Sequence, residues 1–126
     1  MRIISGKFKG KNIQYLKNSI TRPLKDSVKE NIFNILAHSN ILGVRIEGSN
    51  ILDLYSGIGS FGIEAISRDA KKVTFVEQDE KASKVLQENL LKLSMNNKSK
   101  VINDKIESIL KKENKEKFDI FFLDPP

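Results

Sequence analysis

The fold is decided by residues 51–62, which read ILDLYSGIGSFG. The first four residues form an apolar run typical of a buried strand, and a helix is predicted to begin at Ser60. Between them, Gly57, Gly59 and Gly62 match the spacing G-x-G-x-x-G. Glycines there allow a sharp turn and let a ligand lie against bare backbone, while the helix N-terminus offers free N–H groups. The stretch therefore predicts a nucleotide-binding loop that joins a strand to a helix.

Downstream of this loop, short apolar runs alternate with amphipathic helices. Strands are predicted over residues 51–54, 73–76, 101–102 and 119–123, and helices over residues 60–68, 79–93 and 106–110. The second helix has Asp79 placed as its N-terminal cap, and one face carries Ala82, Leu86, Leu90 and Leu93. This alternation indicates an α/β protein with a parallel sheet and helices on both faces. The last strand is apolar and lies near a sheet edge, so we expect an incomplete sheet and a chain that is a fragment.

The first 48 residues follow a different pattern. Residues 1–15 read as a small β-hairpin with lysines on one face and turns at Gly6 and Gly10. A helix follows, for which Ser27 and Glu30 have the spacing of a capping box. Its predicted buried face, at helical spacing, consists of Val28, Ile32, Ile35 and Leu36. We therefore divide the chain into an N-terminal extension, residues 1–48, and a Rossmann-like domain, residues 49–126.

The net charge of +6 is concentrated in the extension. The first thirty residues hold eight basic and two acidic side chains, whereas the other residues hold equal numbers of each. A concentrated basic segment suggests a polyanionic partner, because phosphate contacts release counterions. A solvated, lysine-rich surface is the alternative reading. The candidate RNA-binding residues are Arg2, Lys7, Lys9, Lys11 and Arg22.

Composition excludes several kinds of site. The chain has no cysteine and a single histidine, His38, which excludes thiolate and multi-histidine metal sites. No run approaches the ~20 apolar residues of a membrane span, and no secretory signal begins the chain. We therefore expect a cytoplasmic monomer without a metal ion or a membrane partner.

The acidic residues at the strand ends discriminate between nucleotides. A carboxylate at Asp53 would repel the pyrophosphate of a dinucleotide, but it suits the amino and sulfonium cations of S-adenosylmethionine. Glu77 ends the next strand, where it can accept both ribose hydroxyls. Asp104, after the third strand, is a candidate for the adenine amine. Capping or loop bracing by Asp53 and a turn role for Asp104 remain alternatives. With Tyr55 and the three glycines, these residues form the predicted cofactor site.

The fourth strand ends in Asp124-Pro125-Pro126, where open α/β sheets place reacting groups. The Asp124 carboxylate and the Pro125 carbonyl are two acceptors that can orient a planar amine on a nucleobase. They can also stabilise the positive charge that develops on its nitrogen during methyl transfer. Without the upstream loop, the same residues read as a turn that ends a strand.

These motifs together resemble the RsmD family of bacterial methyltransferases. The similar segments are residues 2–10 (RIISGKFKG), 21–23 (TRP), 26–36 (DSVKENIFNIL), the cofactor loop 53–65, 75–77 (FVE) and 124–126 (DPP). The two N-terminal segments are the more specific, because the loop and Asp-Pro-Pro occur across many amine methyltransferases.

The resemblance implies transfer of a methyl group to the exocyclic N2 amine of a guanine in 16S ribosomal RNA, free or in the small subunit. It also implies a Rossmann-like S-adenosylmethionine-dependent fold of seven strands, with the extension gripping RNA. The family's motif continues beyond the prolines to an aromatic residue and further strands, so we expect this chain to be an inactive fragment. Three alternatives remain: an amine methyltransferase acting on adenine or DNA, a nicotinamide-dependent oxidoreductase, and a non-catalytic RNA-binding module.

Overall fold

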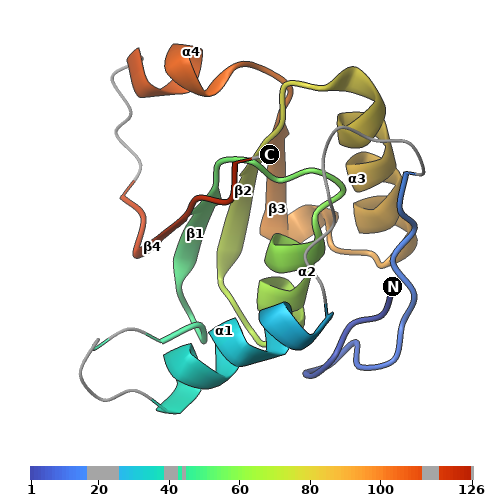
Figure 1. Cartoon of the computed structure of the whole chain (residues 1–126), viewed down its shortest axis with the longest axis vertical. Helices are drawn as coiled ribbons and strands as arrows, with labels where there is room; N and C mark the ends of the chain where they lie inside the picture. The colour runs from blue at the N-terminus through green and yellow to red at the C-terminus, as the bar shows by residue number, and fades with distance from the viewer. Residues whose placement is uncertain (17–25, 39–42, 44, 112–116, 126) are drawn as a thin grey trace.

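A four-stranded parallel sheet, in the order β3-β2-β1-β4, forms the centre of the computed structural model (Figure 1). The structure describes residues 1–16, 26–38, 43, 45–111 and 117–125. The strands are β1 Asn50–Asp53, β2 Lys72–Val76, β3 Ser99–Ile102 and β4 Ile120–Phe122. All four predicted strands are confirmed, and each boundary lies within two residues of the prediction.

The helices after the loop are also confirmed. They are α2 Ser60–Ser67, α3 Glu80–Lys92 and α4 Ile106–Lys111, and a 3-10 turn, η1 Asn96–Lys98, precedes β3. Asp79 caps α3, because its carboxylate accepts a hydrogen bond of 2.9 Å from the Ala82 N–H. The predicted buried face of α3 is confirmed too, since Ala82, Leu86, Leu90 and Leu93 are all buried.

Helices cover both faces of the sheet, as predicted. On one face, Ile51, Val73 and Phe75 of the strands share the larger core with α1 Asp26–His38, α2 and α3. On the other face, Ile109 of α4 packs with a smaller core of strand residues, Leu52, Leu54 and Val76. β4 is an edge strand of the described sheet, and its outward-facing Phe121 is exposed. Among the described residues, none of the helices is long and apolar enough to cross a membrane.

The first sixteen residues, here called the N-terminal arm, run along the outside of α2 and α3 (Figure 1). The predicted hairpin is confirmed in reduced form: one antiparallel bridge joins Arg2 to Asn12. Ile3 and Ile13, next to the bridge, are buried in the larger core. Three backbone hydrogen bonds also join its two halves: Ile3 N–H to the Lys11 carbonyl, Gly10 N–H to the Ile3 carbonyl and Ile13 N–H to the Met1 carbonyl. The arm therefore packs as part of the domain.

The sequence prediction for α1 is wrong in two respects. The helix includes Asp26, so Ser27 lies in its first turn and is not the cap of the predicted box. Val28 and Ile35, predicted to be buried, are 43% and 59% exposed. The fully buried residues are instead Lys29 and Phe33, one turn apart. The helix is rotated from the prediction because Phe33 stacks on Phe61 of α2 and Lys29 meets a buried carboxylate.

Candidate active site

The carboxyl ends of the four strands bring the predicted acidic residues to one edge of the sheet. Asp53 ends β1, where it pairs in register with Phe75 of β2 and Phe122 of β4. Glu77 and Asp124 therefore lie two residues beyond Asp53 on the neighbouring strands. β2 and β3 follow on one side of β1, whereas β4 lies on its other side. Ligands of open α/β sheets bind at such a switch point, which here lies between β1 and β4.

Asp53 is the most unusual residue of this edge. Its side chain is 1% exposed, and neither carboxylate oxygen has a hydrogen-bond partner within the described part of the chain. Burial raises the pKa of the Asp53 carboxyl to about 7. The nearby Ser56 hydroxyl and the Tyr55 backbone N–H lower this pKa, and the carboxylates of Glu77 and Asp124 raise it. The Ser56 Oγ donates its hydrogen bond, of 2.8 Å, to the backbone carbonyl of Asp53. A buried carboxyl group without partners is costly, and a cationic ligand would offset that cost.

The glycines of the loop are required mainly by the packing of the protein itself. Gly57 and Gly59 have φ values of 55° and 96°, in the left-handed region. A Cβ at Gly59 would collide with Leu86 of α3, and one at Gly62 would collide with the Phe75 ring of β2. Gly59 also precedes α2 without a side-chain cap, which leaves the N-terminus of α2 available to a ligand.

Glu77 braces the loop from the end of β2. It is 5% exposed; its Oε1 accepts the Gly57 N–H at 2.8 Å and its Oε2 accepts the Asp79 N–H at 2.9 Å. Each carboxylate oxygen can accept a further hydrogen bond, so the predicted ribose contact is compatible with this bracing. Asn103, which the sequence did not single out, donates to the backbone carbonyl of Glu77 at 2.8 Å and so fixes the end of β2 to the loop after β3.

The remaining predicted site residues lie around these groups. Asp104 is half-buried, and its Oδ1 accepts the N–H of the next residue, Lys105, at 2.7 Å. Tyr55 is half-buried against the smaller core. Asp124 and Pro125 are exposed, while Pro126 lies outside the described residues. Within the described residues, no group of three His, Cys, Asp or Glu side chains could hold a metal ion.

The basic residues of the arm face solvent. Arg2, Lys7, Lys9 and Lys11 are all exposed, and Lys7 pairs with Asp69 at 3.4 Å on the surface. Arg22, the fifth predicted RNA contact, lies outside the described residues. The structure thus presents four cations on one short segment that is docked beside the helix of the glycine loop.

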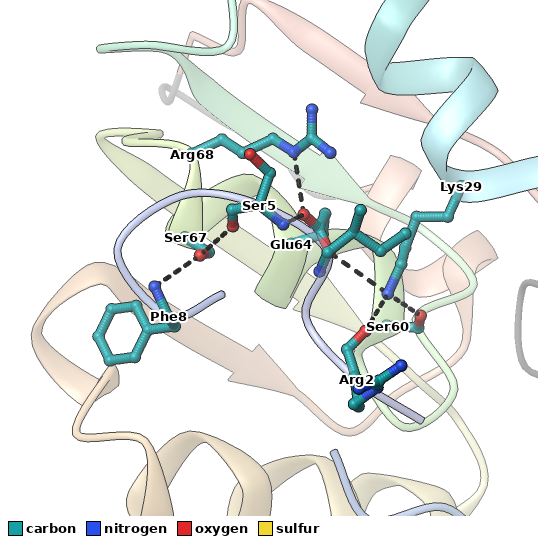
Figure 2. A network of polar contacts seen from close by, with 9 residues as sticks. Arg2, Ser5, Phe8, Lys29, Ser60, Glu64, Ser67 and Arg68 are labelled. Carbon is teal, nitrogen blue, oxygen red and sulfur yellow. Dashed lines mark hydrogen bonds and ion pairs between the residues drawn. The ribbon is translucent and has the colours of Figure 1, made fainter. Parts of the chain in front are cut away.

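Buried polar residues that the sequence analysis missed join the arm to the loop. Lys29 of α1 and Glu64 of α2 are both fully buried and form an ion pair of 3.4 Å (Figure 2). Asn89 of α3 is 2% exposed and makes hydrogen bonds to the backbone of the arm and of the glycine loop. One signal was available: between Ser60 and Ser67 of the predicted helix, Glu64 is the single charged residue among apolar or small ones, and burial of such a residue demands a partner.

Comparison with known proteins is consistent with this geometry. The family model described as "Conserved hypothetical protein 95" matches residues 1–126. The "Ribosomal RNA small subunit methyltransferase D" of Haemophilus influenzae is 41% identical over 100% of this chain and 63% of its own length. The protein of the same name from Escherichia coli K12 is 34% identical over 100% of this chain and 60% of its own length. The chain therefore spans less than two thirds of these curated relatives.

Solved structures are similar over the same region. The structure of the "Putative methyltransferase yhhF" from Escherichia coli is 32% identical with a TM-score of 0.84, covering 100% of this chain and 64% of that chain. A structure from Pyrococcus horikoshii, titled "a putative RNA methyltransferase PH1948", is 27% identical with a TM-score of 0.69, covering 90% and 55%. These likenesses confirm the Rossmann-like methyltransferase fold, and with the full-length match of the family model they show that the chain belongs to the RsmD family.

Proposed function

We propose that this chain forms the cofactor-binding part of an S-adenosylmethionine-dependent methyltransferase whose target is the N2 amine of a guanine in 16S ribosomal RNA. The observation that carries the proposal is Asp53, a buried carboxyl group without partners at the switch point of the sheet. The names of the relatives, which are small-subunit ribosomal RNA methyltransferases, support the reaction class and the substrate class.

Asp53 favours a cationic ligand over a dinucleotide. A pyrophosphate next to Asp53, Glu77 and Asp124 would add negative charge to a site that already holds three carboxyl groups. S-adenosylmethionine has no phosphate, and its amino and sulfonium groups are cations. Bonds from a charged donor to a carboxylate contribute about 1.5–3 kcal/mol each, more than neutral bonds. The charge of the site therefore supports S-adenosylmethionine.

The other loop residues would hold the rest of this cofactor. Glu77 has free acceptor capacity for the ribose hydroxyls, and the N-terminus of α2 has no side-chain cap, which leaves its backbone N–H groups for the ligand. Tyr55 and Asp104 flank the same edge of the sheet and are proposed as contacts to the adenosine portion. S-adenosylmethionine supplies an activated methyl group on its sulfonium.

Asp124 and the prolines after it would receive the target base. The Asp124 carboxylate and the Pro125 carbonyl can accept the two hydrogens of the amine, which orients its nitrogen and favours the positive charge that develops there. With the cofactor bound, these two acceptors would hold the amine nitrogen towards the sulfonium methyl group that the cofactor would supply, and the proton lost from the nitrogen would pass to solvent. Pro126, with its fixed φ, is proposed to hold the turn rigid.

The basic extension, residues 1–48, is proposed to contact RNA, and residues 49–126 to bind the cofactor. Four exposed cations on the arm, Arg2, Lys7, Lys9 and Lys11, support this division. Arg22 is proposed as a further contact from its place in the sequence. A cytoplasmic monomer acting on ribosomal RNA, free or in the small subunit, completes the proposal.

Calorimetric titration tests the cofactor. S-adenosylmethionine should bind and NAD should not, and Asp53→Asn should weaken S-adenosylmethionine about 10–100-fold, which corresponds to loss of one charge-assisted contact. Glu88→Gln, which removes an exposed carboxylate from α3, is the matched control and should bind normally. Binding of NAD alone would overturn the proposal, and unchanged affinity in Asp53→Asn would make Asp53 a structural residue.

Methyl transfer to 16S ribosomal RNA tests the substrate. The protein as its gene encodes it is incubated with radiolabelled cofactor and small subunits or 16S transcripts, and the modified nucleoside is identified by mass spectrometry. N2-methylguanosine is expected. N6-methyladenosine, or methylation of DNA only, would replace the guanine proposal with an adenine or DNA methyltransferase.

The salt dependence of RNA binding tests the arm. Lys9→Ala with Lys11→Ala should lower the slope of log K against log salt by about 1.4–1.8, because two phosphate contacts are lost. The control, Lys111→Ala with Lys117→Ala, removes two exposed cations that lie after β3, away from the arm. Equal slopes in both variants would show that the charge of the arm is ordinary surface.

A further inference from the structure

Asn89 of α3 holds two distant segments with one side chain. Its Oδ1 accepts the Gln14 N–H at 2.9 Å, and its Nδ2 donates to the Gln14 carbonyl at 2.9 Å and to the Ile58 carbonyl at 3.2 Å. Gln14 belongs to the arm and Ile58 to the glycine loop. Because the amide is buried, moving either segment would leave a donor or acceptor unsatisfied.

Lys29 of α1 makes the same connection with a charge. Its Nζ lies 3.4 Å from the Arg2 carbonyl in the arm, 3.3 Å from Ser60 Oγ at the end of the loop, and 3.4 Å from Glu64 Oε1 (Figure 2). The three donors of the ammonium group therefore face three oxygens. These contacts are longer than the ~2.7–2.9 Å of a well-formed charged hydrogen bond, so a small shift of arm or loop can tighten them.

Glu64 and Ser67 of α2 fix the arm on the other side. The Glu64 carboxylate accepts the backbone N–H groups of Ile4 and Ser5 at 2.8 and 3.0 Å, and it pairs with Arg68 at 2.9 Å (Figure 2). Ser67 Oγ donates to the Ser5 carbonyl at 2.6 Å. The arm has its own backbone hydrogen bonds, and side chains of α1, α2 and α3 fix its position on the domain.

We propose that Asn89 and Lys29 are positioning residues that couple RNA binding on the arm to cofactor binding on the glycine loop. The inference rests on the proposed function, in which the arm contacts RNA and the loop holds the cofactor. Both side chains make their full set of bonds only when the arm and the loop lie in the relative positions that the structure shows. RNA that fixes the arm therefore favours the loop geometry that the cofactor selects, and by thermodynamic linkage the cofactor strengthens RNA binding equally.

The test measures the dissociation constant of S-adenosylmethionine by calorimetry with and without a saturating 16S ribosomal RNA transcript. In the unaltered protein, RNA should tighten the cofactor about 5-fold or more, the lower range of measured couplings. Asn89→Leu should bring this ratio close to one. Gln87→Ala, on the exposed face of the same helix, should leave the ratio unchanged.

A second variant keeps the test decisive if Asn89→Leu does not fold. Ser60→Ala removes only the loop partner of Lys29 and leaves the ion pair with Glu64 and both Gln14 bonds in place. It should lower the ratio while the melting temperature stays close to that of the unaltered protein. A ratio of one in the unaltered protein with RNA bound, or an unchanged ratio in Ser60→Ala, would overturn the coupling and leave the proposed function standing. Absence of any RNA binding would overturn both.

Discussion

Replacing Asp53 with asparagine should stabilise the ligand-free protein by an amount that grows with pH. The carboxyl group is 1% exposed, and neither of its oxygens has a partner among the described residues. Its pKa is raised from 3.8 to about 7, chiefly by burial. Asparagine has nearly the same shape but no ionisation, so the pair isolates the cost of the buried charge.

The sign follows from proton binding in the two states. The unfolded chain releases the Asp53 proton near pH 3.8, whereas the folded protein keeps it until about pH 7. Between these values the folded state binds the extra proton, so each rise of one pH unit lowers the free energy of unfolding by about 1.4 kcal/mol. Across about three units the total is about 4 kcal/mol. Below this window the penalty is absent, and above it the penalty is constant.

Urea unfolding of both proteins between about pH 4 and about pH 8 provides the assay. The difference in unfolding free energy, Asp53→Asn minus unaltered, should rise by about 1.4 kcal/mol per pH unit and level off near pH 7. A constant offset would reflect the packing of the amide and is not diagnostic. Glu88→Gln should give a flat difference, because that side chain is exposed. A flat difference for Asp53→Asn as well would refute the buried, protonated carboxyl group.

Three further outcomes are expected. If the cofactor binds only to the ionised form of Asp53, its affinity measured by calorimetry should decrease as the pH falls below about 7, by up to about tenfold for each pH unit. An affinity for S-adenosylmethionine that does not change with pH would contradict this contact. Gly6→Ala should lower the melting temperature far more than Gly10→Ala. Both glycines have φ near 85°, but only at Gly6 would the added Cβ collide with α2. Equal losses of melting temperature would argue against close docking of the arm on α2. Lys29→Met should cost about 1–3 kcal/mol in urea unfolding, because Glu64 loses one buried partner but keeps Arg68 and two backbone N–H groups. Addition of Glu64→Gln should cost less than the sum of the single changes, and strict additivity would deny the ion pair.

The parts of the fold that were predictable from sequence are those in which local pattern and tertiary packing agree. In α3, Asp79 has the chemistry of a cap and Leu86 and Leu90 repeat at helical spacing, and the structure uses all three accordingly. The glycine loop was recognisable because its residues are contiguous. The close packing at Gly59 was not, because the atom that a Cβ would meet there belongs to Leu86, 27 positions away in the sequence.

The wrong assignment of the buried face of α1 has one cause. Hydrophobic periodicity treats lysine as a surface residue, so Val28 was assigned to the buried face and Lys29 was left out of it. The structure reverses them because Glu64 provides a buried carboxylate opposite Lys29. The role of Asn89 is hidden for a similar reason: its partners are backbone atoms of two other segments, which no residue pattern marks.

Burial of polar groups serves two different purposes in this protein, and the difference points to where the ligand acts. Glu64, Lys29 and Asn89 are buried with partners for their polar atoms, so they connect the arm and the loop to three helices. Asp53 is buried without partners and destabilises the folded state as its charge develops. Glu77 holds the glycine loop beside this unpaired carboxyl group, because its Oε1 accepts the Gly57 N–H. A cationic ligand at Asp53 would therefore remove the electrostatic penalty that the buried carboxylate imposes at this edge of the sheet.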